Sequence, residues 1–159
     1  MELSSAIIGL ACIALFVVPI YLLSKTGNQK QKQQMRVFLA FCSGKGLNLT
    51  QKEAWNDCAI GIDETSNQLV YVKDTEGGRQ EVLIDLNEVA QCNIVNSSRE
   101  VKSGGSTQRV IERLDLQFLF KKSGKTPETL EFYNARKQYQ LSGEFQLIEK
   151  WLKIIRQAI

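Results

Sequence analysis

An uncharged run of 21 residues near the N-terminus, Leu3 to Leu23, constrains this chain more than any other feature. As an α-helix it is roughly 31 Å long, which matches the hydrocarbon thickness of a bilayer. The run is apolar all round, whereas a buried helix in a globular domain normally keeps a polar face. A cleaved signal peptide requires a basic N-terminal region, and the only early charge is Glu2. We therefore predict a transmembrane anchor over residues 1–24.

The charges that follow this run predict its direction. Between Ser24 and Lys52 the sequence holds no acidic residue and six basic ones: Lys25, Lys30, Lys32, Arg36, Lys45 and Lys52. Under the positive-inside rule, the C-terminal side is cytoplasmic and the short N-terminus lies outside. The candidate membrane-surface contacts are Lys25, Lys30, Lys32 and Arg36, each able to contribute about 1 kcal/mol of attraction to anionic lipid.

The net charge argues against nucleic acid as a partner. The whole chain carries +3, and the six basic residues together with Glu2 account for +5 of it, so residues 53–159 carry −2. A nucleic-acid-binding domain normally presents a basic surface. The mild basicity of the chain therefore belongs to the segment beside the membrane, and we predict membrane lipid as the partner of that segment.

The residue types present exclude several kinds of catalytic site. There is no histidine, which removes Ser-His-Asp and Cys-His nucleophiles and all metal sites that contain histidine. The four cysteines, at positions 12, 42, 58 and 92, form no CxxC pair. We expect them to be reduced and to behave as small hydrophobic residues. The sequence thus predicts no cofactor, no metal and no enzymatic activity.

Residues 25–54 are predicted to be a basic juxtamembrane linker that contains a helix over about 29–41. Two interpretations of this helix are open: an amphipathic collar on the membrane surface, or a stalk whose C-terminal end packs on the following domain. Four large apolar residues in five, Val37, Phe38, Leu39 and Phe41, leave no polar face and favour the stalk. Thr50 and Glu53 have the spacing of a capping box, which predicts a single helical turn containing Trp55.

From Ala59 onward the apolar residues recur with period two, which is typical of half-buried strands. This pattern predicts six strands joined mainly by short turns into an antiparallel meander, over residues 59–63, 68–73, 79–86, 90–96, 113–121 and 129–134. Residues 97–108 are polar with adjacent glycines and are predicted to be a mobile loop. Ser142 is the predicted N-cap of a final amphipathic helix that covers the sheet.

Four strand-like stretches and the helix after Ser142 resemble a pleckstrin-homology-like domain in the broad sense that includes GRAM-type domains: TSNQLVYV (65–72), VLIDLNEV (82–89), LDLQFLF (114–120) and LEFY (130–133). The whole chain is similar to small bacterial membrane-anchored proteins with such a domain. The resemblance implies an α+β fold over residues 55–159, a mainly antiparallel β-barrel closed by the C-terminal amphipathic helix. Phosphoinositide-binding members carry a basic first hairpin, whereas here Asp74 and Glu76 dilute Lys73 and Arg79, so headgroup binding is not implied.

These features favour a membrane-anchored cytoplasmic binding or scaffolding module with another protein as its partner. The alternative is a structural subunit of a larger membrane complex, held through the transmembrane helix or an exposed strand edge. An enzyme is a third hypothesis, which the missing histidines disfavour.

Overall fold

The computed structural model describes residues 31–103, 105–138 and 140–159. The predicted transmembrane segment over residues 1–24, together with Lys25 and Lys30, lies outside this part of the chain. Of the helices that are described, none is long and apolar enough to cross a bilayer. The described residues begin with a helix over 31–44 and end with a second helix, α2 (Glu144–Ala158).

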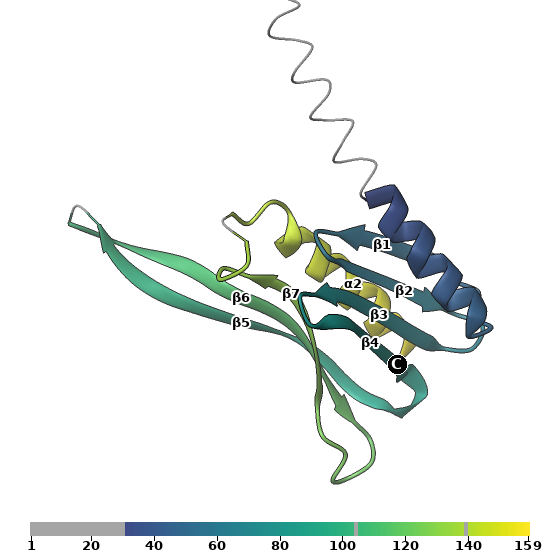
Figure 1. Ribbon diagram of the computed structural model, residues 1–159. Coiled ribbons are helices and arrows are strands. Elements are labelled where there is room, and N and C mark those ends of the chain that lie inside the picture. The colour runs from purple at the N-terminus through teal and green to yellow at the C-terminus, as the bar shows by residue number, and fades with distance from the viewer. Residues whose placement is uncertain (1–30, 104, 139) are drawn as a thin grey trace, which may run out of the picture.

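Between these helices the chain forms two antiparallel sheets (Figure 1). The first sheet has four strands in sequence order: β1 (Gln51–Trp55), β2 (Cys58–Asp63), β3 (Gln68–Thr75) and β4 (Gly78–Asp85). A short 3₁₀ helix, η1 (Leu86–Glu88), leads into the second sheet. That sheet has three strands, also in sequence order: β5 (Val89–Ser103), β6 (Ser106–Phe120) and β7 (Glu128–Asn134).

The predicted PH-like β-barrel closed by a C-terminal helix is wrong, because the strands form two separate sheets and no closed barrel. Period-two alternation shows that a strand buries one face, but it does not show which strands are neighbours or whether a sheet closes. The helical turn predicted around Trp55 is also wrong. Pairing with β2, which sets Trp55 opposite Cys58, makes this segment strand β1.

The main core lies between the two sheets and α2. Fully buried residues from all three layers meet there, including Ile60 in β2, Leu69 in β3 and Leu116 in β6. The apolar stripe of α2 is buried through Ile148, Trp151 and Ile155, which confirms the amphipathic helix. Its N-cap differs from the prediction.

The helix start is built by Gly143 and Glu144 instead of a capping Ser142 side chain. Gly143 is the N-cap residue, with φ at 112°, a left-handed conformation that favours glycine. The Glu144 carboxylate accepts a hydrogen bond from the backbone N–H of Ser142 at 2.6 Å. The acidic side chain therefore organises the turn that enters α2.

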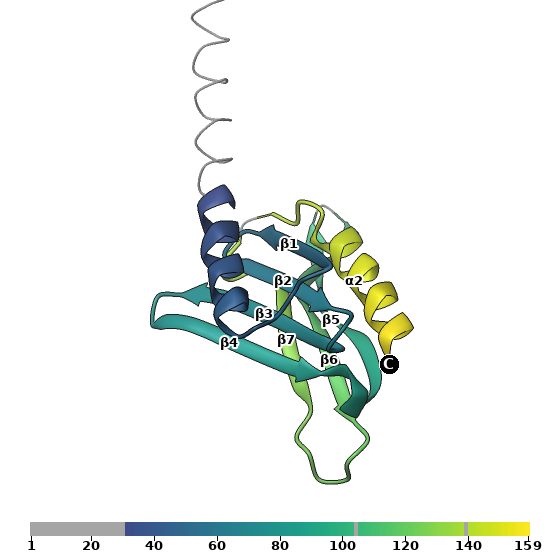
Figure 2. The same ribbon diagram turned by 90° about the vertical axis from the view of Figure 1, so that its right-hand side faces the viewer.

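A second, smaller core lies on the other face of the first sheet. Phe38 and Cys42 of the helix over 31–44 pack there against Ala59, Val70 and Val72. Strands β2 and β3 are consequently covered on both faces, by this helix on one side and by the main core on the other (Figure 2). This packing confirms one part of the stalk interpretation, that the C-terminal end of this helix packs on the following domain, although Gln31 also contacts the first sheet.

Candidate functional site

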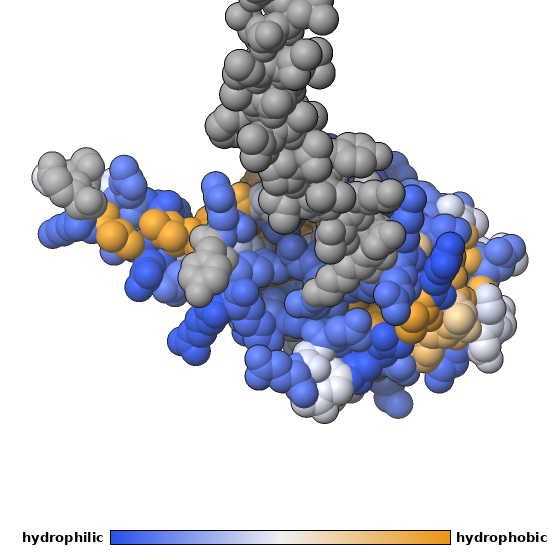
Figure 3. Space-filling view, turned by 45° about the horizontal axis from the view of Figure 1, so that its top comes forward, coloured by the Kyte–Doolittle hydropathy of each residue, from blue (hydrophilic) through white to orange (hydrophobic). Residues whose placement is uncertain are grey.

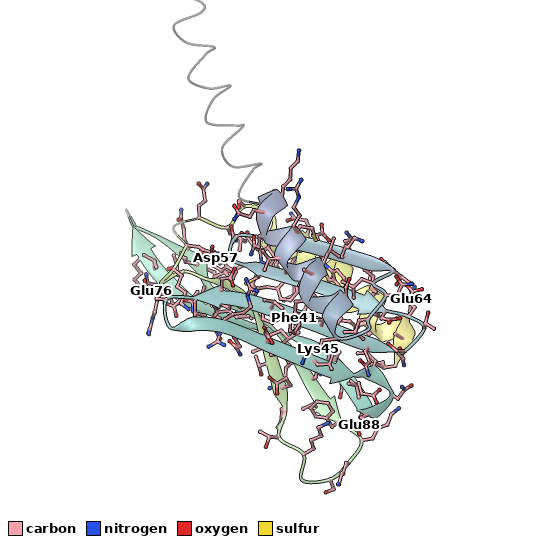
Figure 4. The ribbon with its side chains drawn as sticks, turned by 45° about the vertical axis from the view of Figure 1, so that its right-hand side comes forward. Phe41, Lys45, Asp57, Glu64, Glu76 and Glu88 are labelled. Carbon is pink, nitrogen blue, oxygen red and sulfur yellow. The ribbon has the colours of Figure 1, made fainter. Side chains whose placement is uncertain are left out.

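A pocket of about 580 Å³ opens at one end of the two sheets. One wall comes from the β1–β2 turn, the end of β3 and the β3–β4 turn, and the other from β7 and the loop that follows it. Asp57 and Glu76, from two of these turns, lie at the same end of the molecule (Figure 4). The volume is in the range that holds a small molecule or a few residues of a peptide.

An ion pair between Lys73 in β3 and Glu131 in β7 lies in the pocket wall and joins the two sheets. Lys73 is only 8% exposed. The second carboxylate oxygen of Glu131 accepts a hydrogen bond from Asn134 Nδ2 at 2.9 Å, and Arg113 Nε lies 3.8 Å from it. Burial alone would raise the pKa of Glu131, but the hydrogen bonds from Lys73 and Asn134 outweigh it and lower the pKa. The carboxylate is therefore ionised at neutral pH.

Tyr71 and Cys58 lie beside this ion pair and carry no charge. The Tyr71 hydroxyl donates to the backbone carbonyl of Glu131 at 2.6 Å, and the Cys58 sulfur lies 3.2 Å from the same hydroxyl. Burial raises the pKa of both groups. A nucleophilic cysteine needs a lowered pKa, so this thiol does not suit nucleophilic catalysis.

A further pair extends the polar region across β6. Arg113 Nε lies 2.7 Å from a carboxylate oxygen of Asp115, which is buried. Burial raises the pKa of Asp115, although the Arg113 guanidinium partly offsets this effect. We call Lys73, Arg113, Asp115 and Glu131 the charge cluster. Its two cations and two carboxylates neutralise one another, so it offers no uncompensated charge for an ionic substrate.

The rim of the pocket separates charges of opposite sign. Asp74 and Glu76 stand on the side of the β3–β4 turn, whereas Arg136 and Lys137 stand on the loop after β7. Arg79 partly neutralises Asp74, with its Nε 2.8 Å from the carboxylate. The rim therefore suits a ligand that carries both a positive and a negative group.

Gln138 adds an unsatisfied acceptor to the wall of this pocket. Its side-chain oxygen is buried and has no hydrogen-bond partner among the described residues. A buried acceptor without a donor is unfavourable by about 1–3 kcal/mol. A ligand that brings an N–H or O–H group to this wall can recover part of that cost.

The predicted membrane-surface residues lie apart from the charge cluster. Lys32 and Arg36 are exposed on the helix over 31–44, and Lys25 and Lys30 precede the described residues. The described part of that helix starts beside the pocket end of the first sheet, because Gln31 Nε2 donates to the carbonyl of Ala54 at 2.8 Å. The chain thus enters the described part of the molecule near the pocket.

The sequence interpretation missed the charge cluster, although one signal for it was present. Lys73 shares a face of β3 with Leu69 and Tyr71, and a lysine on the apolar face of a strand needs a buried partner. The identity of that partner was hidden, because Glu131 lies 58 positions away and on another sheet.

Metal ligation finds no support in the described chain, where no group of three or more cysteine, aspartate or glutamate side chains is placed to hold an ion. No protein-family model, curated protein or solved structure matches this chain. The PH-like resemblance therefore stays a prediction about family. The chemistry of the pocket has to be argued from its own residues.

Proposed function

We propose that this chain is a single-pass membrane-anchored binding module, and that the pocket between β3 and β7 receives a segment of another protein that carries both charges. The observation that carries the proposal is the separation of acidic and basic side chains on the two sides of the pocket rim. The charge cluster in the wall is already neutralised internally, so the rim sets the preference for a ligand. Binding, not catalysis, is the activity that this arrangement supports.

The proposed anchor places the pocket toward the membrane. We propose that residues 3–23 span the bilayer with the N-terminus outside and the folded part in the cytoplasm. The helix over 31–44 begins next to the pocket end of the first sheet. Lys25, Lys30, Lys32 and Arg36 would then lie at the lipid surface, and the partner segment would reach the pocket close to the bilayer.

Site-specific photocrosslinking in native membranes tests the pocket. A photoreactive residue at Glu76, on the rim, should give a discrete adduct, whereas the same residue at Lys122 should not. Lys122 is a control that is also exposed, in the β6–β7 loop, which lies at the other end of the molecule (Figures 1 and 2). Reversing both charges of the basic wall, Arg136→Glu with Lys137→Glu, should weaken the adduct at least fivefold. Equal labelling from positions 76 and 122, or an adduct whose yield the charge reversal does not reduce, contradicts the proposal.

Reporter fusions test the orientation separately. A reporter that works only in the cytoplasm should be active at the C-terminus, and a reporter that works only after export should be active at the N-terminus. If an export-dependent reporter is active at the C-terminus, the proposed orientation is refuted. The pocket experiment remains interpretable in that case.

A structural subunit of a larger membrane complex is the second candidate function. It is favoured by the long hairpin of β5 and β6, which extends away from the rest of the described chain (Figure 1). A projecting hairpin of this kind is a possible contact surface for a neighbouring subunit.

A further inference from the structure

The β5–β6 hairpin continues well past the end of the second sheet. Strand β7 pairs with β6 only from Arg113 to Phe118. Beyond that point β5 and β6 pair with each other alone, from Ser98 opposite Ile111 to the end of the hairpin. We call residues 98–111 the arm. A two-stranded ribbon by itself is only marginally stable in water, so a third strand along its edge would stabilise it.

Side chains of other elements protect parts of three edge strands of the described chain, β1, β7 and β5. These side chains donate to backbone carbonyls at three places: Gln31 to Ala54 in β1 (2.8 Å), Trp55 to Phe132 in β7 (3.1 Å) and Arg156 to Cys92 in β5 (3.2 Å). Arg156 protects only the first half of β5. Within the described part of the arm, no other element donates such a bond to β5, so the backbone edge of its second half is open for pairing.

The arm carries apolar valine side chains next to charged side chains of opposite sign. Val101 and Val110 share one face as diagonal neighbours, and Val110 is 40% exposed. Apolar side chains are visible on the arm among hydrophilic ones (Figure 3). Along β5, the charged Glu100 and Lys102 flank Val101. An antiparallel partner strand with the same order would match these charges.

We propose that the arm pairs with the arm of a second copy of this chain, β5 against β5, antiparallel about a twofold axis at Val101. Glu100 of each copy then lies opposite Lys102 of the other, which gives two pairs of opposite charge. The two Val101 side chains face each other at the centre, with a Val110 diagonal to each. The interface is isologous, and it joins the two three-stranded sheets into one of six strands.

The two neighbouring twofold registers, with the axis at Glu100 or at Lys102, are less favourable. A twofold axis at Glu100 sets two glutamates opposite each other, and an axis at Lys102 does the same for two lysines. The axis at Val101 therefore satisfies both the charges and the apolar side chains. This self-association goes beyond the proposed binding function, because no arm residue lines the pocket between β3 and β7.

Only a few residues pair on each side of the axis, so the contact is small. This step rests on the proposed anchor, which would attach both copies to one membrane, raise their effective concentration and favour such a contact. The inference therefore concerns the full chain in its membrane.

Disulfide crosslinking of the full chain in membranes tests the register. Directly opposed residues in antiparallel strands have Cα atoms about 4.5–5.5 Å apart, within the range that a disulfide spans. Val101→Cys should therefore give a covalent dimer on mild oxidation. The matched control is Gln108→Cys, which lies opposite Val101 within the arm and is exposed. Two copies of Gln108 would be three strand spacings apart, roughly 14 Å, so it should crosslink at least tenfold less.

A charge swap supplies the second test. Adding either Glu100→Lys or Lys102→Glu to the Val101→Cys chain should reduce the yield of covalent dimer at least threefold. Adding both reversals to the same chain should restore that yield. Co-expressed Glu100→Cys and Lys102→Cys chains, which retain Val101, should crosslink to each other. Background from the native cysteines is measured with the unaltered chain, in which Cys42, Cys58 and Cys92 are buried. Equal crosslinking at positions 101 and 108, or no recovery in the double reversal, overturns the proposal.

Discussion

Replacing Glu131 and replacing Lys73 both break the Lys73–Glu131 ion pair, but the two changes should lower the free energy of unfolding by different amounts. Glu131→Gln leaves a buried ammonium group without its carboxylate, because Lys73 is 8% exposed. Lys73→Met instead leaves a carboxylate that keeps the hydrogen bond from Asn134 at 2.9 Å and the guanidinium of Arg113 at 3.8 Å. The loss from Lys73→Met should therefore be the smaller one.

Removing one partner of a buried ion pair costs about 3–5 kcal/mol, and replacing both partners with apolar residues is often nearly neutral. The pair lines an open pocket, so we expect the low end, about 3 kcal/mol for Glu131→Gln. For Lys73→Met we expect about 1.5 kcal/mol, since two partners remain. The double variant Lys73→Met with Glu131→Gln should lose less than Glu131→Gln alone, and together with the two single variants it gives a coupling energy.

Chemical unfolding of the full chain in detergent, followed by Trp fluorescence, measures these differences. The pH dependence adds a check, because the pKa of Glu131 is lowered in the folded state. Its stabilisation is complete above the ordinary value of 4.5 and is lost as pH falls through the folded-state pKa. The difference between wild type and Glu131→Gln should consequently shrink at low pH. A larger loss for Lys73→Met than for Glu131→Gln would refute the reasoning.

Three further predictions follow from the contacts. Asp63 accepts backbone hydrogen bonds that lower its pKa, and the largest effect comes from the N–H of Asn48 at 2.9 Å. The stability that these bonds provide is lost as pH falls below 3.8. Asp63→Asn should therefore lose less stability over that pH range, as measured from unfolding midpoints. Trp55→Phe removes the 3.1 Å hydrogen bond to the carbonyl of Phe132 that links the two sheets, and should cost about 1–2 kcal/mol in chemical unfolding. Replacing residues 99–110 with an Asn-Gly turn should change the melting temperature by less than about 4 °C, since these residues lie outside both cores, and a larger fall would show that this part of the arm supports the fold.

The arm illustrates a limit of reading strands from periodicity. Residues 97–108 are predicted to be a loop because they are polar and contain adjacent glycines, yet the structure places residues 97–103 in β5 and residues 106–108 in β6. Much of the arm is exposed on both faces, so there is little apolar alternation to detect there. Its strand conformation comes from cross-strand pairing, which local composition does not encode.

The charge cluster shows the same limit for a site. The alternation in β3 placed Lys73 on the face of Leu69 and Tyr71, so the need for a partner was present in the sequence. The choice of Glu131 as that partner depends on how β7 meets β3 at the junction of two sheets. Such a contact is a property of the packed layers and not of any local pattern.

The amino-acid pattern alone determined the antiparallel strands from β2 to β7 and the amphipathic α2, because local periodicity decides which face of an element is apolar. The missing histidines likewise limited the available chemistry without any structure. Packing in three dimensions decided that the strands form two sheets instead of a barrel, that Trp55 lies in β1, and that Lys73 meets Glu131. These features depend on contacts between residues far apart in the chain, and the energies of such contacts exist only once the layers are assembled.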